Sequence, residues 1–146
     1  MANELISKLC ALRDDRAALS ALRAWFSPAR QSQAWPFMGR LGVLGSSEDS
    51  GAGEFIAAAF GFHPLLTEDG SFASVCRNLK TEHSTVEKRF QRVLSSRRGE
   101  LPKAIFPLLQ MARAKKVPIP YGKLYEDVKF WGPRKHREWA ADFWKE

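Results

Sequence analysis

The sequence predicts an all-α fold, a compact bundle of about eight to nine helices that can divide into two small lobes. Three observations lead to this prediction. Apolar residues recur at intervals of three and four almost throughout the chain, which is the period of an amphipathic helix. No segment shows the sustained apolar–polar alternation that marks a strand. The 146 residues, 45% of them hydrophobic, are enough to bury a core.

Helical patterns in the N-terminal half cover, in order, residues 5–12, 18–26, 35–44, 54–62 and 72–80. Either Asp14 or Asp15 can cap the second of these helices. The run GSSEDSGAG at 45–53 predicts a loop, because it lacks the Gly-Lys-Ser/Thr ending that a phosphate-binding loop needs.

Four more helices are expected in the C-terminal half, built on the apolar residues of 86–94, 105–112, 124–131 and 139–144. Ser84-Thr85-Val86-Glu87 has the pattern of a capping box that opens the first of them. Pro102 suits the first turn of the next helix, and Pro107 inside it implies a kink or a late start. Val117-Pro118-Ile119-Pro120 predicts an extended connection.

Charge is distributed unevenly along the chain. Residues 1–73 carry six Lys/Arg and eight Asp/Glu, a net charge of −2, whereas residues 74–146 carry seventeen and eight, a net charge of +9. We therefore expect an N-terminal helical lobe over residues 1–82 and a C-terminal basic helical lobe over residues 83–146. This asymmetry favours a nucleic-acid partner, with an acidic protein partner or a plain solvated face as the alternatives.

No apolar run approaches the ~18 residues of a membrane-spanning helix. The first twelve residues are too polar for a secretory signal, so a cytoplasmic location is expected. Cys10 and Cys76 are far apart and flanked by apolar positions, which favours buried free thiols over a disulfide.

The sequence predicts neither an enzyme nor a cofactor or metal site. His63, His83 and His136 are isolated, and none belongs to a zinc-binding spacing. The adjacent carboxylates Asp14-Asp15 and Glu48-Asp49 are explained by helix capping and loop solvation, since neighbours on a helix point about 100° apart.

The helix at 86–94 has the most suggestive basic pattern. Lys88 and Arg92 are i, i+4 neighbours away from its apolar stripe, and Arg89 lies at the stripe's edge. Eleven Lys/Arg stand against three Glu between residues 77 and 116, so a phosphate-binding surface is predicted there. The candidate residues are Arg77, Lys80, Lys88, Arg89, Arg92, Arg97, Arg98, Lys103, Arg113, Lys115 and Lys116.

Seven aromatic residues of this half recur at helical spacing, which favours core packing over base stacking. They are Phe90, Phe106, Phe130, Trp131, Trp139, Phe143 and Trp144. We therefore expect contacts with the nucleic-acid backbone and no base readout.

Four ordered stretches of the C-terminal half form a specific set. They are STVEKRF at 84–90, VPIPYGKL at 117–124, DVKFW at 127–131 and REWAADFW at 137–144. This set resembles S-x-E-R-R-F, G-V-P-L-D-W-x-x-L, D-L-x-x-W and R-x-W-A-R-D-F-Y of the CasB family, the small subunit of the type I-E CRISPR surveillance complex, Cascade. Residues 13–19, 62–64 and 71–72 resemble the family more loosely.

The resemblance implies a non-catalytic, all-helical subunit that stabilises the R-loop guided by CRISPR RNA in antiviral defence. It implies three sets of partners: CRISPR RNA and target DNA, the backbone and large subunits of Cascade, and a second copy of this chain. Arg89 matches the arginine before the family's phenylalanine, and Arg23 lies near a family arginine of the second helix.

Two positions depart from the family pattern. Phe106-Pro107 and Ala141 stand where the family often has basic residues. Contacts made there by relatives are therefore either missing from this chain or supplied by Lys103 and Arg113.

A stand-alone, helix-turn-helix-like DNA-binding regulator is the alternative function. Pro118 and Pro120 disfavour the tight turn that leads into a recognition helix. The helix that follows also spends Leu124, Val128 and Trp131 on the core.

Overall fold

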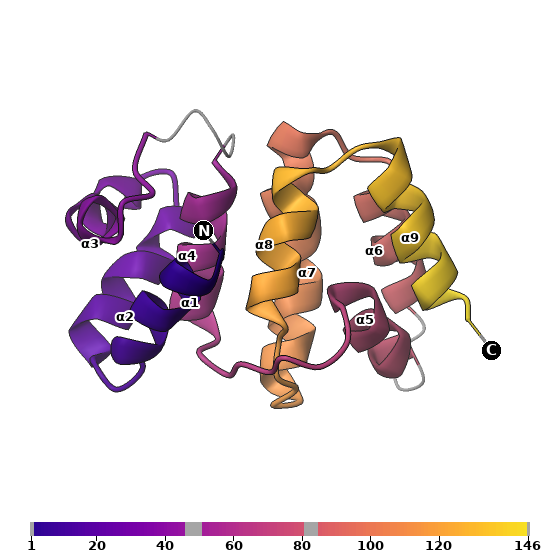
Figure 1. Ribbon diagram of the computed structural model, residues 1–146, viewed down its shortest axis with the longest axis horizontal. Helices are drawn as coiled ribbons and strands as arrows, with labels where there is room; N and C mark the ends of the chain where they lie inside the picture. The colour runs from indigo at the N-terminus through magenta and orange to yellow at the C-terminus, as the bar shows by residue number, and fades with distance from the viewer. Residues whose placement is uncertain (1, 46–50, 81–84, 146) are drawn as a thin grey trace. The chain divides into compact units, whose positions relative to one another are not determined.

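A computed structural model describes residues 2–45, 51–80 and 85–145 of the chain (Figure 1). Within these residues the regular structure is helical, with nine α-helices and three short 3-10 helices. The one strand-like feature of the described part is an isolated bridge between Leu66 and Ile119. The predicted all-α class and the predicted number of helices are confirmed. The chain forms two compact units, Met1–Pro64 and Leu65–Glu146.

The first unit contains, in chain order, α1 (Ala2–Ala11), α2 (Arg16–Arg23), η1 (Ala24–Phe26), η2 (Gln31–Ala34), α3 (Trp35–Leu41) and α4 (Ala52–Phe62). The carboxylate of Asp15 accepts a hydrogen bond from the backbone N–H of Ala18 at 3.0 Å, so Asp15 is the residue that caps α2. Helix α3 ends before the expected residue 44 because Gly42 adopts the left-handed conformation, with φ of 78°.

Helices α2 and α4 approach each other closely because small residues line the contact. Ala57, Ala58 and Ala59 of α4 are fully buried. At Gly61 a β-carbon would lie 2.7 Å from Leu22 Cβ and 2.8 Å from the carbonyl oxygen of Leu19. Glycine is therefore required at position 61 by the proximity of the α2 backbone.

The second unit contains α5 (Phe72–Lys80), α6 (Val86–Leu94), η3 (Arg98–Glu100), α7 (Leu101–Ala114), α8 (Tyr121–Lys129) and α9 (Pro133–Phe143). Helix α7 begins at Leu101 and runs through Pro107, so the late start offered by the sequence is wrong. Ser84 of the predicted capping box lies outside the described residues. The predicted extended connection is confirmed: Ile119 donates to Leu65 O at 2.9 Å and accepts from the Thr67 N–H at 3.1 Å.

The division between the units falls after Pro64, whereas the change of charge placed a lobe boundary between residues 82 and 83. That expected boundary lies at 81–84, outside the described part of the chain. Helix α5 packs against α9 in the second unit, where the Phe72 and Trp139 rings lie 5.8 Å apart. The first unit has six basic and six acidic residues and the second has seventeen and ten, so the net charge of +7 belongs to the second unit.

An aromatic cluster forms the core of the second unit. The rings of Phe90 and Phe143 stack with centroids 4.1 Å apart, and Trp131 meets Trp139 edge to face at 4.9 Å. Since Phe90 belongs to α6 and the others to α9 or the segment before it, these rings fix α6 against α9.

The prediction of core packing is wrong for two of the seven aromatic residues. Phe130 is 62% exposed and Trp144 is 40% exposed, and Phe106 is half-buried. The indole N–H of Trp144 donates to Glu87 at 2.9 Å on the surface.

Asp127 is a buried carboxylate that joins α8 to α9. Its Oδ2 accepts the indole N–H of Trp139 at 2.8 Å, and its Oδ1 lies 3.1 Å from Lys135 Nζ and 3.3 Å from Lys123 Nζ. Burial by itself would lower the pKa of Lys135, but its hydrogen bond and ion pair with Asp127, aided by Glu138, raise the pKa above its ordinary value. The carboxylate is therefore surrounded by donors from two helices.

We predict that Gly61→Ala destabilises the chain by about 1–3 kcal/mol, because the added methyl group overpacks the α2–α4 contact. The matched control is Gly39→Ala in α3, where a β-carbon would meet nothing within 4 Å, and its effect should be neutral or slightly stabilising. Urea unfolding followed by circular dichroism measures both. Equal stability of the two variants would contradict the close approach.

We predict that Asp127→Ala lowers the free energy of unfolding by about 3 kcal/mol, because it leaves the Trp139 N–H and Lys135 without their buried acceptor. Glu138→Ala removes an exposed partner of the same lysine and should cost much less. Urea unfolding monitored by tryptophan fluorescence compares them. Equal losses in the free energy of unfolding would show that the burial of Asp127 contributes nothing to stability.

Candidate nucleic-acid interface

Helix α6 turns its cations to solvent because its opposite face is buried. Val86, Phe90 and Val93 are fully buried in the second unit. Lys88 and Arg92 each lie two residues from Phe90, about 200° around the helix axis, and both are exposed.

Helices α6 and α7 form an antiparallel pair that joins two groups of basic residues. Arg89 of α6 donates to the sulfur of Met111, near the end of α7, at 3.2 Å. Arg92, nearer the end of α6, lines a concavity together with Lys103 at the start of α7. We call the exposed cations of this pair and its connection the α6–α7 basic surface: Lys88, Arg89, Arg92, Arg97, Arg98, Lys103, Arg113, Lys115 and Lys116.

The α6–α7 basic surface is long enough to follow a short segment of one nucleic-acid strand. The fourteen residues of α7 span about 21 Å at ~1.5 Å each. That length equals about six phosphates of one strand at the duplex rise of ~3.4 Å. Two carboxylates lie in the same segment. Glu87 accepts the indole N–H of Trp144 and Glu100 accepts the backbone N–H of Arg97 at 3.2 Å, so hydrogen bonds within the protein hold both side chains in place.

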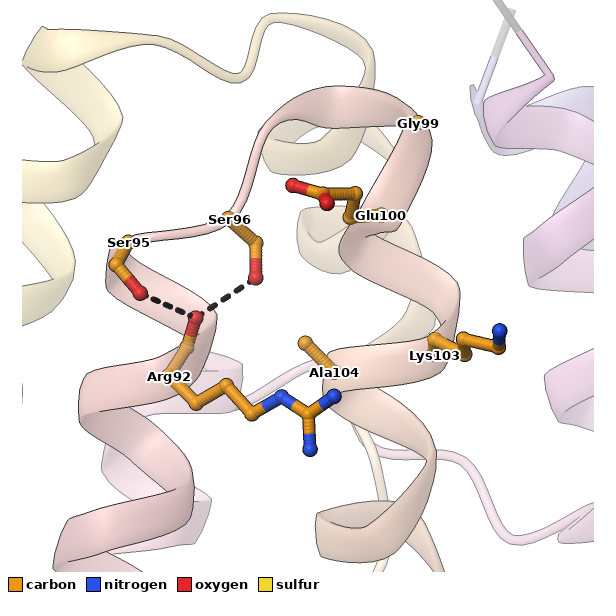
Figure 2. A pocket seen from close by; sticks show the side chains of 7 residues that line it. All are labelled: Arg92, Ser95, Ser96, Gly99, Glu100, Lys103 and Ala104. Atoms are coloured by element: carbon orange, nitrogen blue, oxygen red, sulfur yellow. Dashed lines mark hydrogen bonds between the residues drawn. The ribbon is translucent and has the colours of Figure 1, made fainter.

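Figure 2 shows the concavity of about 560 Å³ between the end of α6 and the start of α7. The hydroxyl groups of Ser95 and Ser96 donate to the carbonyl oxygen of Arg92 at 3.0 and 2.7 Å, which secures the end of α6. The guanidinium of Arg92 extends toward α7, whereas the Lys103 side chain points away from it (Figure 2). The two cations therefore present their charge in different directions.

The C-terminus of α7 holds its cations in a defined turn. Val117 N–H donates to Ala112 O at 2.9 Å and Lys116 N–H donates to Arg113 O at 3.1 Å. Lys116 takes the left-handed conformation, with φ of 57°, at a position where glycine is preferred. A lysine there costs about 1 kcal/mol of backbone strain.

Arg77 and Lys80 of α5 are engaged within the protein. Arg77 Nη1 donates to the carbonyl oxygen of Asp142 at 2.6 Å. Lys80 Nζ lies 3.5 Å from the carbonyl oxygen of Phe143 and 4.6 Å from the centroid of its ring. Both cations satisfy carbonyl groups in the last turn of α9, which has no intrahelical donors for them. Their contact with nucleic acid stays a prediction.

Arg23 ends α2 in the first unit and is exposed. It therefore belongs to a different unit from the other eleven candidates, and its contact with nucleic acid also stays a prediction.

Phe130 and Lys129, at the end of α8, are not among the candidate residues predicted from the sequence. Lys129 Nζ lies 5.5 Å from the centroid of the exposed Phe130 ring. The exposure of Phe130 could have been predicted from the helical period. Phe130 follows the buried Val128 by two residues, so it lies about 200° from the apolar stripe.

Cys10 and Cys76 are free cysteines, as predicted. Only Cys76 is fully buried, and burial raises the pKa of its thiol far above the ordinary value. Within the described ranges, no group of three or more His, Cys, Asp or Glu could hold a metal ion. None of the described helices combines the length and apolar character needed to cross a membrane.

The family model of the CRISPR-associated protein Cse2 matches residues 15–144. The fold is similar to the crystal structure of CasB from Thermus thermophilus, with a TM-score of 0.78 and 21% identity. It is also similar to a second crystal structure from Thermus thermophilus, of a CRISPR-associated protein of the Cse2 family, with a TM-score of 0.82 and 18% identity. Each comparison covers 99% of this chain and 98% of the other. No curated protein sequence matches the chain.

We predict that Arg77→Met destabilises the protein by about 2 kcal/mol, because the carbonyl oxygen of Asp142 loses a charged, half-buried donor. Lys88→Met makes the same change of charge at an exposed position and should alter stability by less than ~0.5 kcal/mol. Thermal and urea unfolding of both variants test this separation of structural from surface cations. A stable Arg77→Met variant would show that the bond to Asp142 contributes little to stability.

Proposed function

This chain belongs to the CRISPR-associated Cse2 family, and from that premise we propose that it is a non-catalytic small subunit of a type I-E Cascade. In this role it binds nucleic-acid backbone and stabilises the R-loop guided by CRISPR RNA, in the cytoplasm and in antiviral defence. The observation that carries the proposal is the α6–α7 basic surface, nine exposed cations gathered on one helical pair and its connection.

Binding through these cations would be independent of base sequence. Lysine and arginine side chains reach phosphate oxygens and release condensed counterions, and such contacts position a strand without reading it. Sequence would be read by pairing between the CRISPR RNA and the target strand, so the protein needs no recognition helix.

A small contribution from each phosphate is sufficient for this role. Opening a DNA duplex while an RNA–DNA hybrid forms is a nearly balanced exchange of base pairs. A few backbone contacts made only by the open state therefore shift the equilibrium toward the R-loop. The length of α7 allows several such contacts on one strand.

We assign the proposed protein partners mainly to the first unit. It carries six basic and six acidic residues, so it has no net attraction for a polyanion. The partners proposed are the backbone and large subunits of Cascade and a second copy of this chain, with CRISPR RNA and target DNA on the α6–α7 basic surface.

No observation favours the stand-alone regulator. In such a regulator α8 would have to serve as the recognition helix, but α8 buries Tyr121, Leu124 and Val128 in the protein. The segment before it is extended and paired with residues 65–67 through Ile119, where a tight turn would be needed.

The decisive test is R-loop formation by reconstituted Cascade that contains Lys88→Ala/Arg89→Ala/Arg92→Ala. We expect the complex to assemble and to bind target DNA at least tenfold more weakly. If about five phosphates are contacted on a single strand, the slope of log K against log salt should be near −3.5 for the wild type. Loss of three contacts should reduce its magnitude by about 2.

The matched control is Arg134→Ala/Arg137→Ala/Lys145→Ala, which removes the same charge from exposed positions of the second unit that are not among the candidate residues. It should leave the salt slope unchanged. Equal weakening by both triple variants would show a general effect of net charge. Normal binding by the α6 variant, with loss when the whole chain is omitted, would transfer the function to protein contacts or to Arg113, Lys115 and Lys116.

A further inference from the structure

Phe130 is the most exposed large hydrophobic side chain among the described residues, at 62%. It follows α8 directly, and its backbone N–H donates to Glu126 O at 3.0 Å, so the residue is held by the last turn of the helix. The next residue, Trp131, is buried, and its indole N–H donates to Ser96 O at 3.0 Å. The Phe130 ring is therefore presented to solvent from a fixed backbone.

Two cations from different elements lie in this region, one near the ring and one bonded to the backbone of the next residue, Trp131. Lys129 Nζ lies 5.5 Å from the Phe130 centroid and 6.0 Å from that of Tyr125. Arg98 Nη2, at the start of η3, donates to the carbonyl oxygen of Trp131 at 3.4 Å. An aromatic face bordered by positive charge is the arrangement that binds unpaired bases together with their phosphates.

The segment that carries Phe130 is joined to the α6–α7 basic surface by hydrogen bonds through Ser96. Ser96 contributes its carbonyl oxygen to Trp131 and its hydroxyl group to Arg92 O, so one residue joins both regions. Ser96 also lines the concavity that contains Arg92 and Lys103. A strand that runs over these cations has an aromatic platform next to its path.

We propose that Phe130 is a stacking platform for an unpaired base, with Lys129 and Arg98 placed for the adjoining phosphates. The proposal rests on the proposed function and deepens it, since it names single-stranded nucleic acid as the ligand of this end of the surface. Charge complementarity favours a polyanion over a protein partner.

The experiment measures binding of the full chain to a labelled oligothymidine and to a duplex of equal length. Phe130→Ala should weaken single-strand binding about tenfold, the loss of one stacked base, and leave duplex binding unchanged. Phe130→Leu should behave like the alanine variant, whereas Phe130→Trp should bind as the wild type does. The exposure of residue 130 means that all three variants should fold, which circular dichroism checks.

A second readout identifies the stacking itself. A 2-aminopurine placed in the oligothymidine should be quenched by the wild-type chain and by Phe130→Trp, and not by Phe130→Ala. Wild-type affinity in Phe130→Leu would overturn the proposal, as would equal weakening of single-strand and duplex binding, or no single-strand binding by the wild type. Loss of assembly into Cascade with intact single-strand binding would identify a protein contact instead and also overturn it.

The proposed function is judged separately, by the salt slope of the α6 triple variant in the complex. Failure of the Phe130 experiment with a reduced slope in that variant would remove only the stacking platform. A normal slope in that variant would remove the backbone-binding role itself.

Discussion

The arrangement of the second unit depends on one buried charge, the carboxylate of Asp127. It accepts from Trp139 and pairs with Lys123 and Lys135, so it holds α8 and α9 together. Taking an aspartate out of water is costly unless opposite charges and donors surround it, as they do here. The consequence reaches α6, because Phe90 lies against Trp139 at 6.1 Å and its orientation turns the cations of α6 outward.

The same unit uses its positive charge in two different ways. Lys135 and Arg77 are half-buried and neutralise a carboxylate or a helix C-terminus. Arg92 and Lys103, by contrast, are exposed beside an open concavity, the Arg92 guanidinium extending toward α7 and the Lys103 side chain pointing away from it. Net charge counts both groups equally, but only exposed cations can exchange condensed counterions for phosphate contacts. The net charge of +7 therefore overstates the charge that is available for phosphate contacts, and the proposed interface is better defined by α6 and α7.

Local chemistry made much of the fold predictable. The carboxylate of Asp15 could be identified as a candidate cap, and the outward position of Lys88 followed from the period of a single helix. The partners of Arg77 could not be predicted in this way, because Asp142 is sixty-five residues away and the contact depends on how α5 meets α9. Phe130 was expected in the core because it shares the helical spacing of six other aromatic residues, whereas its position two residues after the buried Val128 turns it outward.

The position of Phe130 also indicates how a backbone-binding surface can prefer an open strand. Phosphates are present in duplexes and single strands alike, so cations such as Arg92 distinguish the two only weakly. The face of a base is covered by its neighbours in a duplex, but the face of an unpaired base is free to stack on an aromatic ring. Placing one ring beside Arg98 and Lys129 would add a contact that only the opened strand can make. Because the R-loop is nearly balanced against the duplex, a single contact of this kind changes its population markedly.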